Sequence, residues 1–568
     1  MNLITAVKLY VTKMAEESGT GMKVLLMDQY TTSIVSMVYS QSEIMQKEVY
    51  LFEIIDKPGS IEPMKHLKCI VFLRPTKDNV GLLCNELRRP RYGTYYLYFS
   101  NIISKADIKT LAEYDEIEVV REFQEFFGDY LAVSPHLFSL NITGCCQGLN
   151  NWNPDHLLRC VQGVTAVLLS LKKCPNIRYQ GSSMMAEKLA DKIREVLTKE
   201  STLFDYKQPD VPPLLLILDR RSDPITPLLS QWTYQAMVHE LLTISNNRVN
   251  LGKVSSSVSP ELKEVVLSSE QDEFYADNLY LNYGDIGQTL KRLLDDFQKK
   301  ARSHQKVESI AEMKQFVENY PKFKKMSGTV TKHVVIIGEL SALVEKRCLM
   351  EVSEVEQEMV CQDQHSHHLQ RVKSLMSNSK IRNEEACRLV LLYALRYHTH
   401  SNCDIRSLID GLKKRGVPEN MCKMVDEIIY YSLQDSDSSA NLVSQEKVAK
   451  ITKRFFKDLK GVENVFTQHV PTLKETLEEL IKGRLKENVF PFLGSTPPTR
   501  RVQDIIVFMI GGVTYEESLC VYQLNKSSNF GGVQILLGGS TVHNTESFLE
   551  EVSAATQRNR GIGHYRLK

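Results

Sequence analysis

The sequence predicts an α/β protein with a mainly helical segment inserted between two parts of one sheet. Three observations support this fold class. Short apolar runs alternate with helical stretches at the start of the chain, helical spacing dominates the middle, and the alternation returns at the end. Strands that alternate with helices are typical of parallel sheets covered by helices on both faces.

The length and composition are those of a globular protein of about three domains. The chain has 568 residues, of which 42% are hydrophobic and 24% are charged. Domains commonly span roughly 100–200 residues. Lys and Arg total 70 and Asp and Glu total 69, for a formal net charge of +1. This balance lacks the basic footprint that bulk nucleic-acid binding usually requires.

The cysteine pattern and the apolar runs predict a reduced intracellular protein. The 12 cysteines are scattered and form no CxxC pair, and the first residues lack a basic leader followed by a long apolar run. Neither a disulfide framework nor a secretory signal is therefore expected. The longest apolar runs, residues 214–218 and 505–510, are much shorter than the roughly 20 residues of a membrane-spanning helix. We expect partners to bring this protein to any membrane on which it acts.

The first α/β domain is expected over residues 1–132. Apolar runs typical of buried strands cover residues 22–27, 48–52, 69–73 and 95–99. Residues 79–87, between two of these runs, are typical of a helix. Residues 115–127 have helical spacing, with a broad apolar stripe from Val119 to Phe127. This spacing predicts a helix, and such a stripe more often packs into a core than binds a ligand.

A second α/β domain is expected to combine residues 133–230 with residues 490–568. Before the helical segment, residues 214–218 form a strand-like run that ends at Asp219. After it, residues 505–510 and 533–537 form two more such runs. We predict that the two flanks build one sheet and that the helical domain is an insertion into it.

The inserted domain is expected over residues 231–489, with a helical hairpin over about residues 231–350. Pro321 and Gly328 interrupt the helical spacing within this hairpin. Because proline breaks helices, we predict a bend or a hinge there. An ordinary turn between packed helices is the simpler alternative.

Two double-glycine turns resemble the phosphate-binding turns of enzymes. Each follows a C-terminal strand-like run, as Gly511-Gly512 and as Gly538-Gly539. A glycine turn at a helix N-terminus can cradle a phosphate group. Neither turn completes a GxGxxG motif or carries the Lys-Ser/Thr pair of a Walker loop. Thr514 and Glu517 instead fit an N-terminal capping box. Tight strand-to-helix turns are therefore favoured over a nucleotide site.

Two strand-end carboxylates and a histidine cluster are the other candidates for chemistry. Asp28 and Asp219 each end an apolar run, where ligands of α/β folds often bind. Tyr30 occupies the position at which a phosphatase-type general acid would be needed, so capping of the next turn is the favoured role. His365, His367 and His368 lie near Asp363 in a predicted loop, but their spacing fits no standard zinc pattern. We predict no catalytic residue, no metal site and no cofactor.

Several motifs resemble those of the SM (Sec/Munc-type) family of SNARE-binding proteins. The most specific is Gln-Trp-Thr-Tyr-Gln-Ala-Met-Val-His-Glu-Leu over residues 231–241, preceded by Leu-Asp-Arg-Arg over residues 218–221. Leu-Lys-Gly-Val-Glu-Asn-Val at 459–465 and Gly-Arg-Leu-Lys at 483–486 are also similar. The resemblance covers essentially the whole chain and is strongest to the endosomal, vacuolar-protein-sorting branch.

The resemblance implies an arch of three domains that binds a syntaxin-type SNARE at two places. The SNARE's N-terminal peptide would bind a hydrophobic pocket on the first domain. Matched by motif, this pocket contains Ile108, Val119, Val120, Phe123 and Glu125. An apolar anchor beside a carboxylate would suit a short peptide with one apolar and one basic residue.

The second place is a central cleft that would hold the helical body of the SNARE. Matched by motif, its residues are Glu53, Leu294, Pro321 and Val334, and Ser40 stands where many family members carry a basic residue. By holding SNARE helices preorganised, such a protein would lower the entropic cost of their assembly.

The resemblance implies a cytoplasmic regulator or chaperone of vesicle docking and membrane fusion. It would act in endosomal, trans-Golgi and vacuolar or lysosomal transport, as a peripheral protein of Golgi and endosomal membranes. Its expected partners are a syntaxin-type (Qa) SNARE, the assembled SNARE complex and a Rab effector or tether. Two alternatives remain: an α/β enzyme that uses the C-terminal glycine turns, and a structural adaptor for a tethering complex.

Overall fold

The computed structural model describes residues 1–57, 62–207, 209–253, 260–304, 310–433, 466–494, 501–527 and 531–556. The chain divides into two compact units, and each unit combines segments that are distant in the sequence. The first unit comprises Met1–Arg220, Glu475–Val513 and Cys520–Val542, and the second comprises Arg221–Lys474, Thr514–Leu519 and His543–Lys568. The three-domain boundaries inferred from the sequence stay a prediction.

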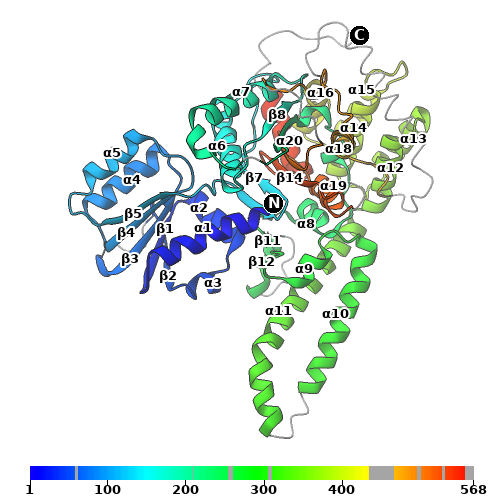
Figure 1. Cartoon of the computed structure of the whole chain (residues 1–568). Helices are drawn as coiled ribbons and strands as arrows, with labels where there is room; N and C mark the ends of the chain where they lie inside the picture. Colours follow the sequence, from blue (N-terminus) through cyan, green and yellow to red (C-terminus); the bar gives the residue numbers. More distant parts are fainter. Residues whose placement is uncertain are drawn as a thin grey trace. The chain divides into compact units, whose positions relative to one another are not determined.

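A five-stranded, entirely parallel sheet lies near the N-terminus of the first unit (Figure 1). Its strands are β1 (Lys23–Met27), β2 (Val49–Ile54), β3 (Met64–Leu73), β4 (Tyr92–Phe99) and β5 (Val120–Glu125), in the order β2-β1-β3-β4-β5. The helices around it are α1 (Leu3–Glu17), α2 (Gln29–Val38), α3 (Gln41–Met45), α4 (Lys77–Arg88) and α5 (Lys105–Tyr114). The predicted parallel sheet is confirmed.

One face of this sheet packs against α4 and α5. The shared core contains Val71 of β3, Leu97 of β4, Leu83 of α4 and Leu111 of α5, each at most 3% exposed. Both helices begin where the sequence supplies a cap. The Thr76 hydroxyl accepts the Asn79 N–H at 3.2 Å, and Ser104 plays the same part at the start of α5. Such caps satisfy backbone groups that the first turn leaves unpaired.

A six-stranded sheet in the same unit is built from both flanks of the inserted segment, as the sequence predicts. Its strands are β6 (Leu131–Ser134), β7 (Leu137–Ser139), β8 (Asn176–Tyr179), β9 (Leu214–Asp219), β13 (Asp504–Ile510) and β14 (Gln534–Gly539), in the order β6-β7-β14-β13-β9-β8. β13 lies between β9 and β14 and is parallel to both. In the sequence, helix α6 (Pro154–Ser170) lies between β7 and β8, α7 (Met184–Lys199) between β8 and β9, and α19 (Tyr515–Lys526) between β13 and β14.

The second unit is mainly helical. Its principal helices are α8 (Tyr234–Leu242), α9 (Glu273–Asn278), α10 (Tyr283–His304), α11 (Ile310–Lys346), α12 (Leu349–Cys361), α13 (His365–Ser377), α14 (Asn383–Tyr397), α15 (Ile405–Lys414), α16 (Glu419–Ser432), α18 (Thr472–Ile481, divided between the units) and α20 (Thr545–Thr556). A small antiparallel sheet contains β10 (Ile244–Ser245), β11 (Arg248–Asn250) and β12 (Glu264–Val266). Within the described residues, no helix is both long enough and apolar enough to cross a membrane.

The long hairpin of this unit consists of α10 and α11, which Figure 1 shows side by side. Near its base, Ile286 and Leu290 of α10 pack into one core with Ile336 and Leu340 of α11. Trp232, from the motif that carries the family resemblance, belongs to this core and donates its indole N–H to Ser353 at 2.7 Å.

The bend or hinge predicted at Pro321 and Gly328 stays a prediction. α11 continues as one helix through both residues. Proline removes one backbone hydrogen bond but does not forbid a helix whose other contacts are favourable. Val330, Ile337 and Val344 are buried on α11, so the helix packs against its neighbours from Val330 onward.

The predicted loop at residues 365–368 and the predicted helix at residues 115–127 are wrong. α13 begins at His365, so the histidines lie in its first turn. After α5 ends at Tyr114, the chain forms strand β5.

Candidate functional site

The five residues matched to a peptide pocket lie together along one edge of the five-stranded sheet. We call them the β5 surface: Ile108, Val119, Val120, Phe123 and Glu125. Ile108 is on α5, Val119 directly precedes β5, and the other three are on β5, which is an edge strand. An edge strand and a neighbouring helix can together accommodate an extended peptide.

A β-bulge brings the side chains of β5 to one face. The register shifts so that Val120 pairs with Tyr95 while Glu122 pairs with Tyr96, which makes Arg121 the extra residue. Paired residues point to the same face of a sheet, whereas neighbours along a strand alternate. Without the bulge, Val120 and Phe123 would lie on opposite faces. Their spacing of three imitates a helix, and this caused the wrong helix prediction.

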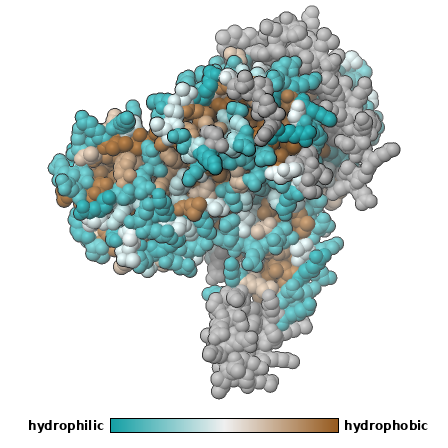
Figure 2. Space-filling model, in the orientation of Figure 1, coloured by the Kyte–Doolittle hydropathy of each residue, from teal (hydrophilic) through white to brown (hydrophobic). Residues whose placement is uncertain are grey.

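The apolar residues of the β5 surface lie at the margin of a hydrophobic core. Phe123 packs against Phe99, with ring centroids 5.4 Å apart, and Ile108 and Val120 are likewise only partly buried. Figure 2 shows hydrophobic surface in the part of the first unit where α5 and β5 lie. Val119 differs from the others because it is 8% exposed and belongs to the core. The surface therefore offers three apolar side chains, with Val119 as their support.

Glu125 provides a carboxylate at the end of this surface. Its Oε1 accepts the backbone N–H of Ile103 at 2.8 Å, which fixes the side chain. Partial burial raises the pKa of the carboxyl group, and the Ile103 N–H opposes this shift. A cationic group beside it would favour the charged form. Glu125 is thus suited to a basic residue of a ligand.

One exposed hydrophobic residue near the β5 surface was missed in the sequence. Ile117, between α5 and β5, is 62% exposed. It is flanked by Glu116 and Glu118, which are also exposed, whereas the carboxylate of Asp115 accepts the N–H groups of Val119 and Val120. The signal was the sequence Asp-Glu-Ile-Glu, in which an apolar residue interrupts an acidic run. Exposed acids here would favour a basic peptide.

Glu53, matched to the central cleft, takes part in an ion-pair cluster within the first unit. Its Oε2 lies 2.7 Å from a terminal guanidinium nitrogen of Arg91, and Arg91 Nε lies 2.9 Å from Glu86. The Glu53 side chain is only 10% exposed. Glu53 therefore has a structural partner, and a role in SNARE binding stays a prediction.

The other residues matched to the cleft lie on the hairpin. Leu294 of α10 is partly buried against the hairpin core, and Val334 of α11 is 38% exposed. Pro321 is within α11, and its side chain lies outside the described residues. Ser40 caps α3, since its hydroxyl accepts the Glu43 N–H at 3.3 Å, and its own N–H donates to the Glu43 carboxylate at 2.8 Å. The hairpin thus exposes at least one large apolar side chain along its length.

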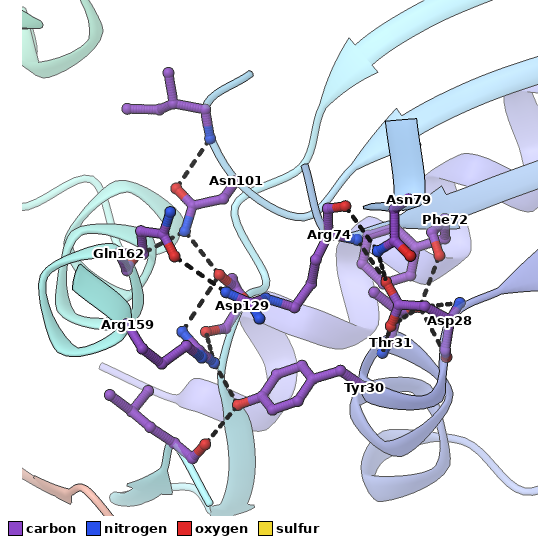
Figure 3. A network of polar contacts seen from close by, with 12 residues as sticks. Asp28, Tyr30, Thr31, Phe72, Arg74, Asn79, Asn101, Asp129, Arg159 and Gln162 are labelled. Atoms are coloured by element: carbon purple, nitrogen blue, oxygen red, sulfur yellow. Dashed lines mark hydrogen bonds and ion pairs between the residues drawn. The ribbon is translucent and has the colours of Figure 1, made fainter. Parts of the chain in front are cut away.

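A buried polar cluster occupies the carboxyl edge of the five-stranded sheet, where an enzyme of this fold class would bind its substrate (Figure 3). The Asp129 side chain is fully buried and accepts from Arg74 at 3.0 Å, from Asn101 at 2.9 Å and from Arg159 at 3.3 Å. Arg159, on α6, also donates to the hydroxyl of Tyr30. The cluster joins the loops after β3, β4 and β5 to α6.

The Asp129 carboxylate of this cluster is shared by two guanidinium groups, those of Arg74 and Arg159. Burial favours the neutral form of Arg159, but the Asp129 carboxylate outweighs this effect and raises the pKa of the guanidinium. Burial likewise raises the pKa of Tyr30, whose hydroxyl donates to the Leu140 carbonyl at 2.8 Å. The arrangement is that of a structural joint, because each charge is held by an opposite charge or a hydrogen bond.

Asp28, at the end of β1, has the capping role that the sequence favoured. Its Oδ1 accepts the N–H of Thr31 at 2.7 Å, and its Oδ2 accepts from the Arg74 N–H and from Asn79. Asp219 is similarly engaged, since its Oδ2 accepts from the Ser183 hydroxyl at 2.6 Å. Both strand-end carboxylates hold neighbouring loops in place.

The glycines of the second C-terminal turn are required by packing. A Cβ on Gly538 would lie 2.0 Å from the ring of Phe138, and one on Gly539 would lie 3.0 Å from Val513. Gly511 and Gly512 have φ values of +79° and +90°, which favour glycine. Thr514 and Glu517 form the predicted capping box, with Thr514 N–H donating to the Glu517 carboxylate at 2.9 Å. The capping box thus occupies two of the backbone N–H groups at this turn, those of Thr514 and Glu517.

The histidine cluster is also engaged within the protein. His365 Nε2 lies 2.7 Å from the hydroxyl of Tyr393, and His368 Nδ1 lies 2.6 Å from that of Tyr397. Burial lowers the pKa of His368 to about 4, and the charge of His367 adds to the effect. Among the described residues, no group of three or more His, Cys, Asp or Glu side chains is arranged to hold a metal ion.

The fold and these surfaces define a class of protein, and comparison with known proteins identifies it. Residues 23–551 match the model of the Sec1 family, so this chain belongs to that family, whose members are also called SM proteins. The chain is 60% identical over 561 residues to human vacuolar protein sorting-associated protein 45, covering 99% of this chain and 97% of the human protein. It is 34% identical to the protein of that name from Saccharomyces cerevisiae, covering 98% and 100% of the two chains.

Solved structures agree with this assignment. The chain matches a structure described as the SM protein Vps45 in complex with the Qa SNARE Tlg2, with a TM-score of 0.90 and 45% identity. That match covers 99% of this chain and 100% of the other. A structure of Vps45 described without a partner matches with a TM-score of 0.87 and 44% identity, covering 98% of each chain. The predicted fold class and family are therefore confirmed.

Proposed function

We propose that this protein is a SNARE-binding regulator of vesicle docking and membrane fusion in endosomal, trans-Golgi and vacuolar or lysosomal transport. The observation that carries this proposal is the full-length similarity to a Vps45 protein solved with a Qa SNARE. The name of the relatives, vacuolar protein sorting-associated protein 45, supports the transport route. A cytoplasmic protein held at Golgi and endosomal membranes by its partners fits this role.

The β5 surface is the proposed binding site of the SNARE's N-terminal peptide. Its three partly buried apolar side chains would receive one apolar residue of the peptide, and Glu125 would pair with a basic residue. The exposed residues Glu116 and Glu118 would add attraction for a basic peptide, mainly by raising the rate of association. The peptide chain could lie along the edge strand β5.

The α10–α11 hairpin is the proposed contact for the helical body of the SNARE. Leu294 and Val334 would provide apolar contacts there. A long, two-helix surface can hold another helix in a fixed register, which lowers the entropy that SNARE assembly loses. A contribution from Glu53 would compete with its ion pair to Arg91. A tether or Rab effector is a further proposed partner of the chain.

The decisive experiment measures binding of a syntaxin-type N-terminal peptide by calorimetry. Phe123→Arg places a charge at the centre of the β5 surface, and we expect affinity to fall by about 30-fold or more. Leu158→Arg is the matched control, because Leu158 is 57% exposed on α6 in the same unit. Unchanged affinity in a Phe123→Arg protein that melts normally would remove the peptide site from β5.

A second variant tests whether the charge of Glu125 contributes to peptide binding. Glu125→Gln keeps an oxygen that can accept the Ile103 N–H but removes the charge. We expect a several-fold loss of affinity that disappears at high salt, because screening weakens charge pairs between partly exposed groups. Equal loss at all salt concentrations would argue against an ion pair with the peptide.

An α/β enzyme that uses the C-terminal glycine turns is the less favoured function. Phe138 fills the space beside Gly538, and the Thr514–Glu517 box uses the first backbone groups of α19. Calorimetry against a panel of nucleotides would test this alternative. Tight, saturable binding that depends on Gly511 and Gly512 would favour the enzyme over the SNARE regulator.

A further inference from the structure

A basic cavity in the second unit has no part in the proposed SNARE contacts. It has a volume of about 890 Å³ and lies between the end of α13, the turn into α14, and α15. We call it the α13–α15 cavity. Five of its lining residues are basic: Lys373, Lys380, Arg382, Lys414 and Arg415. No Asp or Glu lines it, although the chain as a whole is nearly neutral.

The charged side chains surround a floor of buried apolar residues. Met376, Ile381 and Leu408 are at most 7% exposed, whereas Lys380, Arg382 and Lys414 are exposed. Three serines and one asparagine complete the lining, as Ser377, Ser379, Ser407 and Asn383. Hydroxyl and amide groups can donate to phosphate oxygens, and lysine is a common partner of phosphate. An apolar floor beneath donors and cations suits a carbon ring that carries several phosphates.

Arg415 removes the groups that would repel an anion from this cavity. The carbonyl oxygens at the end of α13 and in the following turn carry partial negative charge. Arg415 donates to the carbonyls of Met376, Asn378 and Ile381, with the Asn378 contact at 3.1 Å. Arg415 therefore both shapes the turn and neutralises its carbonyls, so it is a positioning residue.

The neighbouring carboxylates are committed elsewhere or do not line the cavity. Asp404 pairs with Lys373, with Nζ and Oδ2 2.6 Å apart, and Glu385 pairs with Arg347 at 3.5 Å. Lys380 and Lys414 carry their charge at the rim of the cavity, where α15 ends and the turn into α14 begins. The first turn of α14 follows Arg382 and carries two acidic residues, Glu384 and Glu385, neither of which lines the cavity. Attraction for an anion therefore comes from the cations of the cavity and not from the dipole of α14.

We propose that the α13–α15 cavity binds a compact, multiply phosphorylated anion such as an inositol polyphosphate, either free or as the headgroup of a membrane lipid. The volume favours such a ligand over a single phosphate, since a water molecule occupies only about 30 Å³ and binding sites for small molecules commonly span roughly 300–1,000 Å³. Bound to a lipid headgroup, the cavity would add a direct membrane contact to those made by SNARE partners.

The first test is calorimetry of the full chain with inositol hexakisphosphate, with inorganic phosphate as the comparison. We expect saturable binding of one hexakisphosphate and much weaker binding of inorganic phosphate. The double variant Lys380→Ala, Lys414→Ala should weaken binding by about tenfold or more, because hydrogen bonds to charged groups are the stronger ones. Peptide binding at the β5 surface should be unchanged in this variant.

A matched double variant excludes a general effect of net charge. Lys188→Ala, Lys207→Ala also removes two exposed lysines, from the first unit, and should bind hexakisphosphate as the wild type does. An equal loss in both double variants would show diffuse attraction and overturn the proposal. Absence of saturable binding by a wild-type protein that is folded and binds peptide would also overturn it. Melting curves of all variants identify any that fail to fold.

Vesicle flotation distinguishes the two sources of the ligand. Phosphatidylcholine vesicles that contain phosphatidylinositol bisphosphate are compared with vesicles of equal surface charge that contain phosphatidylserine. If the protein prefers the phosphatidylinositol bisphosphate vesicles and the double variant Lys380→Ala, Lys414→Ala loses this preference, the ligand is a lipid headgroup. If the protein binds soluble hexakisphosphate but shows no such preference, the ligand is a free inositol polyphosphate. A phosphoserine peptide that displaces hexakisphosphate at an equal concentration would replace the proposal with a protein partner.

Discussion

At the scale of single residues, the buried charges act as structural joints. Asp129 shows this most clearly, because one carboxylate connects Arg74, Asn101 and Arg159 from three parts of the first unit. In a low-dielectric interior, such a group stabilises the fold only while all its partners are present. The strand-end acids Asp28 and Asp219 have the same character.

Asp129→Asn tests this description. The substitution keeps the shape of the side chain but leaves Arg74 and Arg159 without their counter-charge, so we expect the free energy of unfolding to fall by about 3–5 kcal/mol. Asp191→Asn is the control, because Asp191 pairs with Arg194 at an exposed position of the same unit, and its loss should cost at most about 1 kcal/mol. Denaturant unfolding followed by circular dichroism measures the free energy of unfolding of both variants. Equal losses in the two variants would contradict a special structural role for Asp129.

Glu516 gives a prediction about pH. Burial, assisted by the nearby charge of Glu517, raises the pKa of Glu516 to about 7 from an ordinary value of 4.5. Between these values the folded chain holds a proton that the unfolded chain has released, so stability is lost as pH rises through this range. We expect Glu516→Gln to increase the free energy of unfolding by about 1–3 kcal/mol at pH 8.

The benefit of Glu516→Gln should disappear near pH 4.5, where folded Glu516 is protonated and unfolded Glu516 is partly so. Melting temperatures at the two pH values measure the change. Glu550→Gln, at an exposed position of α20, is the control and should show no such dependence on pH. A constant difference between Glu516→Gln and the wild type would indicate a steric effect instead of titration.

At the scale of secondary-structure elements, β5 and α11 show where local patterns mislead. In β5, one extra residue at Arg121 changes the spacing of the core-facing side chains Val120 and Phe123 from two to three. In α11, the helix continues through Pro321 and Gly328, two residues that disfavour a helix interior.

The glycines of α11 lead to a prediction for the hairpin. Gly328 and Gly338 are exposed, and a Cβ at either position would meet open space. Alanine should therefore stabilise the helix by about 0.5–1 kcal/mol at each position. Hydrogen exchange should show greater protection of α11 in Gly328→Ala, Gly338→Ala. Gly411→Ala in α15 is the control, because its Cβ would lie 2.8 Å from Met376 Cε and should bring no such gain.

At the scale of the whole molecule, the two proposed SNARE contacts belong to different compact units. The β5 surface is in the first unit, and the α10–α11 hairpin is in the second. Two contacts of modest strength on one partner can produce high total affinity, because the second becomes intramolecular once the first has formed. This would explain how a protein with one small apolar surface on each unit holds a long, flexible partner.

A double variant tests whether the two contacts act separately. Phe123→Arg should abolish binding of the isolated N-terminal peptide, whereas Val334→Asp should leave it unchanged and weaken binding of the complete cytosolic part of the SNARE. If the contacts do not influence each other, the two free-energy losses for the complete SNARE add to within about 0.5 kcal/mol. Calorimetry of the two single variants and the double variant measures this sum, and loss of peptide binding in Val334→Asp would contradict separate sites.

The sequence by itself determined the local elements and the family. Hydrophobic runs located β1, β9, β13 and β14, capping residues located helix starts at Asp28 and Thr514, and the Trp232 motif identified the SM proteins. These features depend on neighbouring residues, so they can be inferred from short segments. The return of α/β character after the helical part also predicted that β13 and β14 would pair with earlier strands.

The tertiary structure decided which side chains share a face and why certain residues are present. The bulge at Arg121 depends on pairing with β4, and Gly538 is required by the ring of Phe138. The α13–α15 cavity likewise brings Lys373 and Lys380 close to Lys414 and Arg415. Such features arise from contacts between residues distant along the chain, and these contacts override local preference because packing in the interior leaves few alternatives.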